Sequence, residues 1–182
     1  VQRVIFNFTW SVINEAIGKS IFFITNIYLA RILGVSKYGF FILAQTITFY
    51  FWLIVDLGTS MYGIREIAKN KEKAEKIINS LLTLRITAGF VVFFLYELLV
   101  FLSNIPIIQK FTFIGCGFYL LTYAFYPDWI FKGFEKFKYT AFGSFISSIT
   151  FLIGIIYFVK NSNDLVIAAF IWSFSFSGGS IL

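Results

Sequence analysis

The chain has 182 residues, of which 59% are apolar, 22% aromatic and 13% charged, and its formal net charge is +6. Charged residues are about half as frequent as in an average soluble domain, and a soluble fold of this length could not hide 26 phenylalanines. The composition excludes a soluble domain and predicts an all-α, polytopic transmembrane protein.

The positive net charge does not indicate that the chain binds nucleic acid. Its basic residues lie between long apolar runs, with no water-exposed domain on which a binding patch could form. We therefore interpret this charge as a determinant of membrane topology and a contact for lipid headgroups. The chain has one cysteine, Cys116, and no histidine, which excludes a zinc site and a His-dependent triad. No cofactor and no metal site are predicted.

Six apolar segments follow one another along the chain, each close to the ~20 helical residues that cross a bilayer. The predicted spans are 8–33, 38–59, 80–102, 111–126, 139–159 and 164–182. Short loops containing Gly, Pro or Asn separate most of them. We expect residues 1–182 to form one domain, a six-helix transmembrane bundle.

The first span carries an acid and a base, Glu15 and Lys19, within its apolar sequence. On a helical wheel its polar and small residues fall within an arc of about 140°. They are Ser11, Asn14, Glu15, Gly18, Lys19, Thr25 and Asn26. Because the opposite face is apolar, we expect one face to meet lipid and the other to meet a polar interior.

The second and third spans repeat this arrangement. One face of the second span, within about 80°, carries Gln45, Thr48, Asp56 and Thr59. Arg85 enters the third span at a depth similar to that of Asp56, so these two side chains are positioned to pair. Glu97 lies near the outer end of the third span, where it can extend to the headgroups.

Charges inside a membrane helix cost several kcal/mol, and two interpretations account for them. They can be structural, because the pair in the first span has intrahelical i,i+4 spacing and Asp56 with Arg85 would pin two helices together. Alternatively, they face a hydrated cavity that admits a charged cargo. The amides on the same faces, Asn14, Asn26 and Gln45, favour the cavity.

Residues 64–79 are expected to connect the second and third spans on the cytoplasmic side. They are helix-prone and charged, with an apolar stripe that extends just beyond them: Ile64, Ile67, Ala74, Ile77 and Leu81. Two structures fit this pattern. One is a helix in the plane of the lipid headgroups, and the other is a simple solvated connector.

The distribution of basic residues predicts the orientation. With the N-terminus in the cytoplasm, nine basic residues lie inside and four outside. The inner ones are Arg3, Arg65, Lys69, Lys71, Lys73, Lys76, Lys132, Lys136 and Lys138, and the outer ones are Arg31, Lys37, Lys110 and Lys160. The positive-inside rule therefore places both termini in the cytoplasm.

Two stretches of the sequence carry a family pattern. The first, "YLARILGVSKYGFFILAQTITFYFWLIVDLGTSMYGIREIAK", has the pattern residues Arg31, Leu33, Gly34, Tyr38, Gly39, Asp56, Leu57, Gly58, Gly63 and Arg65. The second, "YPDWIFKGFEKFKYTAF", has Trp129, Gly133 and Lys136. In this order they resemble the Wzx-like polysaccharide flippases of the multidrug/oligosaccharidyl-lipid/polysaccharide exporter superfamily. The resemblance covers about residues 5–150.

The resemblance implies a transporter in the cell membrane and no covalent chemistry. Family members have two MATE-like lobes around a central cavity and move a lipid-linked oligosaccharide outward by alternating access. A cavity cation would neutralise the cargo's phosphate. Lys19 is the leading candidate and Arg85 the second, with Glu15 and Asp56 as their charge partners.

The resemblance also implies that this chain is one lobe of a larger assembly. The sequence stops at "SFSGGSIL", inside an apolar segment, and we expect it to be a fragment or a half-transporter. The expected partners are a missing C-terminal lobe or a second copy, the lipid-linked oligosaccharide and membrane lipids.

Three alternatives stay open. A cation-coupled drug exporter of the same superfamily would have a narrower and more acidic cavity, whereas bases and acids are nearly balanced in these spans. A membrane enzyme acting on polyprenyl phosphates would need an acidic cluster holding Mg²⁺. The interfacial acids are instead scattered: Glu66, Glu72, Glu75, Asp128 and Glu135. The third alternative is a purely structural membrane protein.

Overall fold

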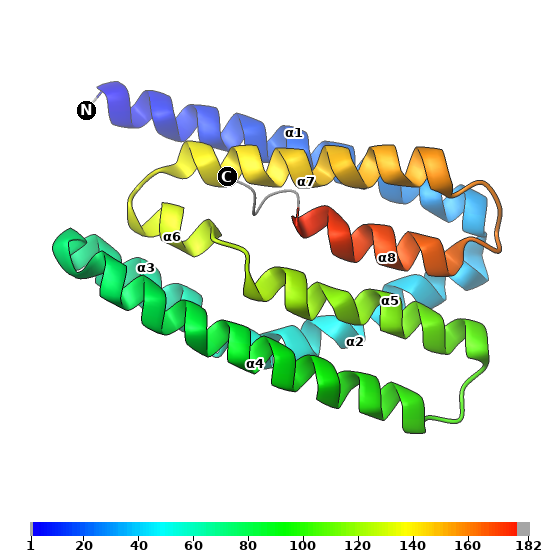
Figure 1. Cartoon of the computed structure of the whole chain (residues 1–182). Coiled ribbons are helices and arrows are strands. Elements are labelled where there is room, and N and C mark those ends of the chain that lie inside the picture. The colour runs from blue at the N-terminus through cyan, green and yellow to red at the C-terminus, as the bar shows by residue number, and fades with distance from the viewer. Residues whose placement is uncertain (1, 178–182) are drawn as a thin grey trace.

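A computed structural model of the chain describes residues 2–177, with side chains described at 12 and from 15 to 177. This part of the chain is helical and contains no strand (Figure 1). Its helices are α1 (Gln2–Leu33), α2 (Val35–Asp56), α3 (Thr59–Lys69), the short 3₁₀ helix η1 (Lys71–Lys73), α4 (Ala74–Leu102), α5 (Ile107–Ala124), α6 (Asp128–Gly133), α7 (Phe137–Phe158) and α8 (Leu165–Ser175).

Five helical stretches within the described range are long and apolar enough to cross a membrane. They are Glu15–Leu33, Val35–Asp56, Lys71–Leu102, Ile107–Gly133 and Phe137–Phe158, and α8 is a shorter apolar helix. Large apolar side chains such as Phe23, Phe94 and Phe101 point outward along these helices. An apolar exterior of this extent matches lipid rather than water. The chain is therefore a multi-pass membrane protein.

The second predicted span ends earlier than expected. α2 stops at Asp56, and the next two residues, Leu57 and Gly58, adopt left-handed backbone conformations with φ of 46° and 74°. Glycine has no side chain to oppose such a conformation, so the sequence can turn sharply here. A separate helix, α3, then begins at Thr59.

The predicted connection 64–79 divides between the end of α3, η1 and the first turns of α4. Asn70 separates them, because its side-chain oxygen accepts hydrogen bonds from the backbone N–H groups of Glu72 and Lys73. An asparagine in this position caps a new helix and so ends the preceding one. α4 consequently starts six residues before the predicted boundary at residue 80, at Ala74.

The helices pack into two neighbouring groups. α1 lies alongside α7, while α5 contacts α2, α4 and α8, and α7 joins the two groups through α8 (Figure 1). The larger core contains Phe41, Tyr96, Phe151 and Trp172, all fully or nearly fully buried. A second core, centred on Trp129, lies where α3 packs against α6.

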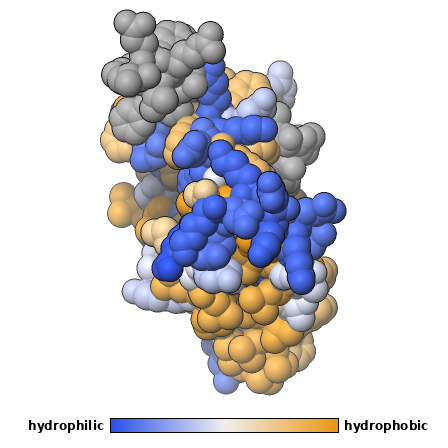
Figure 2. All heavy atoms as spheres, turned by 90° about the vertical axis from the view of Figure 1, so that its left-hand side faces the viewer, coloured by the Kyte–Doolittle hydropathy of each residue, from blue (hydrophilic) through white to orange (hydrophobic). Residues whose placement is uncertain are grey.

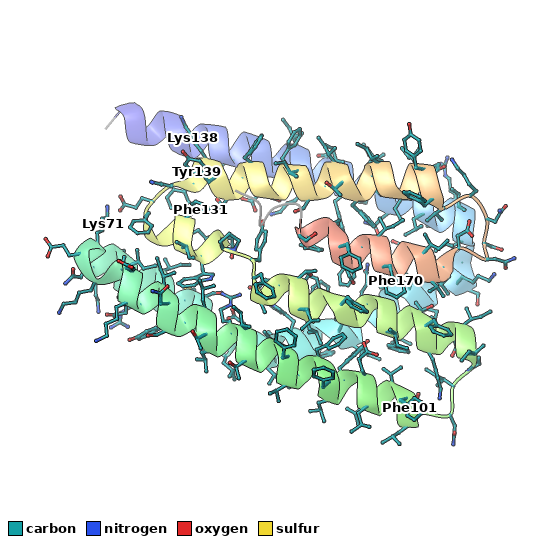
Figure 3. All side chains as sticks on the ribbon, viewed as in Figure 1. Lys71, Phe101, Phe131, Lys138, Tyr139 and Phe170 are labelled. Carbon is teal, nitrogen blue, oxygen red and sulfur yellow. The ribbon has the colours of Figure 1, made fainter. Side chains whose placement is uncertain are left out.

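The two ends of the bundle differ in polarity. α3 and α6 lie at the same end as the start of α1, and this end presents a hydrophilic surface (Figures 1 and 2). Lys71 and Lys138 project there, whereas Phe101 lies at the opposite end (Figure 3). At the polar end the rings of Phe131 and Tyr139 stack, with centroids 5.3 Å apart, and so tie α6 to the start of α7.

Candidate binding cleft

A cavity of about 670 Å³ opens between α1, α2, α7 and α8. Its walls combine one cation, neutral polar groups and aromatic rings. They include Lys19, Phe22, Asn26, Tyr38, Gln45, Phe49, Tyr126, Ser144, Ser147 and Phe176. Three residues predicted from the sequence, Lys19, Asn26 and Gln45, therefore line one space. Asn14, predicted with them, lies outside the side chains that the structure describes.

Lys19, the base of the charged pair on the first helix, lines this cavity. Lys19 Nζ lies 2.8 Å from Glu15 Oε1, and the two side chains are 75% and 55% exposed. The i,i+4 spacing brings them onto one face of α1, as the sequence predicts. An exposed pair of this kind contributes only about 0–1 kcal/mol to stability. Lys19 is therefore accessible to a ligand and does not act as a buried structural residue.

A second cavity of about 480 Å³ adjoins the first, since both are lined by Tyr126, Ser144 and Phe176. Glu15 lines this second cavity together with Asp128 and Lys132. Lys132 Nζ lies 2.7 Å from Asp128 Oδ2, one helical turn away. The cleft made by the two cavities thus contains two lysines, each paired with its own acid.

Sequence reasoning missed Lys132 and Asp128 as members of this site. It placed Lys132 among the topology-determining basic residues and Asp128 among the scattered interfacial acids. The signal that could have found them is their i,i+4 spacing, which repeats that of Glu15 and Lys19. Nothing in the sequence indicated that the serines of α7 belong to this site, because only the packing of α7 on α1 brings them to the cleft.

The neutral polar groups of the larger cavity are partly linked to one another. Tyr38 donates its hydroxyl hydrogen to Asn26 Oδ1 at 3.3 Å, and Asn26 in turn donates through Nδ2 to the carbonyl of Phe22. This link joins α1 to α2 across the cleft. Tyr38 was identified from the family pattern, and the structure gives it a place in the cavity wall.

Arg85 and Asp56 lie elsewhere. Arg85 is fully buried, with Nη2 3.6 Å from Asp56 Oδ1, and it donates through Nη1 to Ser60 Oγ at 3.0 Å. Its guanidinium also lies over the rings of Tyr123 and Trp129, 4.9 and 5.7 Å from their centroids. These contacts surround the buried cation with an acid and two aromatic rings, while its Nε and Nη2 have no hydrogen-bond partner among the described residues.

This arrangement separates residues that the sequence had grouped together. Neither Arg85 nor Asp56 lines the two cavities of the cleft. Both pairs predicted from the sequence are formed, but only the pair on α1 is open to a ligand. The pair formed by Asp56 and Arg85 joins the end of α2 to α4.

The two stretches that carry the family pattern meet at the polar end. Gly63 of α3 lies directly against the ring of Trp129, so closely that a methyl group would collide with it. A methyl group on Gly133 would come within 2.8 Å of Ile67. These glycines allow α3 and α6 to approach closely. Other pattern residues, Arg31, Gly39 and Arg65, are exposed, and Gly34 has a left-handed φ of 76° between α1 and α2.

Comparison with known proteins agrees with this pattern. The sequence profile of the polysaccharide biosynthesis protein family matches residues 4–182. The chain belongs to this family.

The curated relatives are named as transporters. A putative O-antigen transporter of Escherichia coli K12 is 29% identical over 152 residues, which cover 80% of this chain and 36% of the relative. One from Shigella dysenteriae is 28% identical over 151 residues, covering 81% of this chain and 38% of the relative. The chain thus spans less than two fifths of their length. No solved structure matches it significantly.

Proposed function

We propose that the chain forms one lobe of a MATE-like two-lobe transporter that moves a lipid-linked oligosaccharide from the cytoplasmic to the outer leaflet by alternating access. The observation that supports this most strongly is the exposed Lys19 at a cavity whose remaining walls are neutral and aromatic. In the larger cavity, an accessible cation among neutral polar groups suits an anionic headgroup that also carries sugar.

Lys19 is the proposed contact for the cargo's phosphate or pyrophosphate. Glu15 pairs with this ammonium at 2.8 Å. A phosphate oxygen competes with this carboxylate by accepting a charge-assisted hydrogen bond. The polyprenyl tail would stay in lipid, against the apolar outer face of α1. Asn14, Asn26 and Gln45 are proposed to supply polar contacts in the same space.

The sequence indicated Arg85 as a second phosphate contact, with Asp56 as its partner. The fully buried Arg85 presents no surface to a ligand. We therefore assign this pair to the support of the cleft. Through Trp129, next to the cavity-lining Asp128, it fixes the position of α6.

The proposed transporter needs a second lobe to complete the cavity. A C-terminal continuation of the chain or a second copy would supply it, which fits the greater length of the curated relatives. We propose that both termini face the cytoplasm, since the hydrophilic end of the bundle carries the lysine-rich segments around α3 and α6 (Figure 2).

The proposal is tested by transport of a fluorescent lipid-linked oligosaccharide in proteoliposomes made with the full-length protein. Lys19→Gln should lower the initial rate about 10-fold or more, because it removes a charge-assisted hydrogen bond. Lys138→Gln is the matched control: it removes a lysine at the polar end, outside the cleft, and should leave the rate unchanged.

Two results would contradict the proposal. One is export of organic cations with no movement of the sugar lipid, which would identify a drug exporter. The other is chemical conversion of a polyprenyl phosphate by the purified protein, which would identify an enzyme.

A further inference from the structure

Among the eight buried side-chain atoms of the described residues that lack a hydrogen-bond partner, two lie in the wall of the larger cavity. They are Nε2 of Gln45 and Oγ of Ser147, whose residues are only 7% and 6% exposed. Gln45 comes from α2 and Ser147 from α7, so two different helices contribute them to the cavity wall. Buried polar groups are nearly always satisfied in native proteins. These two exceptions line one cavity, where a ligand can supply the missing partners.

Two aromatic rings of this cavity contact a buried ring of the core. The ring centroids of Phe49 and Phe176 lie 5.7 and 5.8 Å from that of Trp172, each in an edge-to-face contact. Trp172 is itself buried in the main core. The cavity therefore offers rigid apolar faces beside an amide and a hydroxyl, which lowers the ordering cost of binding.

This combination identifies the chemistry of the ligand. A pyranose ring has an apolar face of C–H groups and a rim of hydroxyls that both donate and accept hydrogen bonds. Aromatic side chains match the first feature, and amide and hydroxyl side chains match the second. Of the residues that the structure describes, Lys19 alone brings a charge to the wall of this cavity.

We propose that Gln45 and Ser147, with Phe49 and Phe176, form a subsite for a neutral sugar ring, adjacent to the phosphate held by Lys19. This subsite rests on the proposed function and gives it a specificity-determining element. The two polar atoms lie just beneath the cavity wall, so binding requires a rotation of their terminal side-chain bonds. Such torsions are soft, in particular the terminal torsion of glutamine.

The test uses the full-length protein in lipid nanodiscs and lipids that share one phosphate and one tail. The probes are polyprenyl phosphate and polyprenyl phosphosugars carrying glucose, galactose or N-acetylglucosamine. The unmodified protein should bind at least one phosphosugar more tightly than the bare phosphate. Gln45→Met and Ser147→Ala should each reduce this preference about 3- to 10-fold, the usual effect of losing one neutral hydrogen bond. Binding of the bare phosphate should change less than binding of the phosphosugars.

Two comparisons separate recognition from general damage. Ser148→Ala should reduce the preference less than Ser147→Ala, because the hydroxyl of Ser148 already donates to the carbonyl of Ser144 at 2.9 Å. Gln45→Met should also raise the thermal midpoint of the empty protein, since it removes an unsatisfied buried amide. A merely structural role for Gln45 would lower the midpoint instead, and that result would overturn the proposal.

The remaining outcomes are also decisive. Equal weakening of all probes by Gln45→Met, or no effect of either variant, would overturn the sugar subsite and leave the proposed function in place. Tight binding of the bare phosphate with no preference for any sugar would do the same. If the unmodified protein bound none of these lipids, the proposed function would fail and the subsite with it.

Discussion

The pairs Glu15–Lys19 and Asp56–Arg85 have similar chemistry but opposite surroundings. Each joins an acid to a base within apolar helices. The first pair is more than half exposed at a cavity, whereas Arg85 is fully buried and Asp56 is 16% exposed. The comparison shows that the role of a membrane charge follows from what packs around it. An open pair can exchange its partner for a ligand, while an enclosed pair holds helices together.

The largest expected effect comes from breaking the enclosed pair. Arg85→Leu leaves the carboxylate of Asp56 without its cation and should lower the free energy of unfolding by about 3–5 kcal/mol. Denaturant unfolding in detergent micelles, followed by tryptophan fluorescence, measures this loss. The double variant Asp56→Leu/Arg85→Leu should recover part of it. Stability equal to the unmodified protein would show that the pair does not support the fold.

The next effect concerns the packing of α3 on α6 around Trp129, beside the enclosed pair. Gly63→Ala places a methyl group against the indole ring and should cost about 1–3 kcal/mol through overpacking. Gly39→Ala is the matched control, because Gly39 lies within α2 and has open space around it. That change should be neutral or stabilising by about 0.5–1 kcal/mol, since alanine favours the helix. Equal effects of both substitutions would contradict the close contact.

Breaking the open pair, Glu15–Lys19, should reduce transport and have little effect on stability, unlike breaking the enclosed pair. Lys19→Leu removes an exposed ion pair and should change the free energy of unfolding by less than about 1 kcal/mol. The same variant should lose transport, as proposed above for Lys19→Gln. The unfolding assay used for Arg85→Leu makes the comparison direct. A loss of several kcal/mol would make this pair structural, like the other.

The smallest effect lies at the turn between α7 and α8, which is outside both helices of the structure. The backbone N–H groups of Lys160 and Asn161 donate to Asp164 Oδ2, each at 2.9 Å, and these bonds lower the pKa of the Asp164 carboxyl. Because the folded pKa lies below the unfolded value, this contribution to stability is present at neutral pH. It is lost as the pH falls through the folded pKa.

Amide hydrogen exchange at Lys160 and Asn161 tests whether the stability of this turn decreases toward acid pH. Protection should decrease toward acid pH in the unmodified protein, after correction for the intrinsic exchange rate. Asp164→Asn keeps a side-chain acceptor but cannot titrate, so its protection should depend less on pH. Identical pH profiles of the unmodified protein and Asp164→Asn would show that the Asp164 carboxylate does not stabilise this turn.

The sequence by itself determined the properties that depend on composition and local spacing. The apolar runs specify membrane helices because backbone polar groups must be satisfied within lipid. The i,i+4 spacing alone brought Glu15 and Lys19 together on α1. The family pattern was also readable from the chain, and the family profile confirms it. The expected sixth span extends to residue 182, and the part of it that lies in the described range forms the short α8.

Only the tertiary structure decided which polar groups share a space. Trp129 covers Arg85 from a distant part of the chain, so the burial of Arg85 could not be predicted from its own helix. Lys132 and Ser147 reach the cleft because α7 packs on α1 and α6 packs on α7. Helical periodicity defines the face of a single helix, but it does not specify which other helix that face meets. The shape and chemistry of the cleft follow from those long-range contacts.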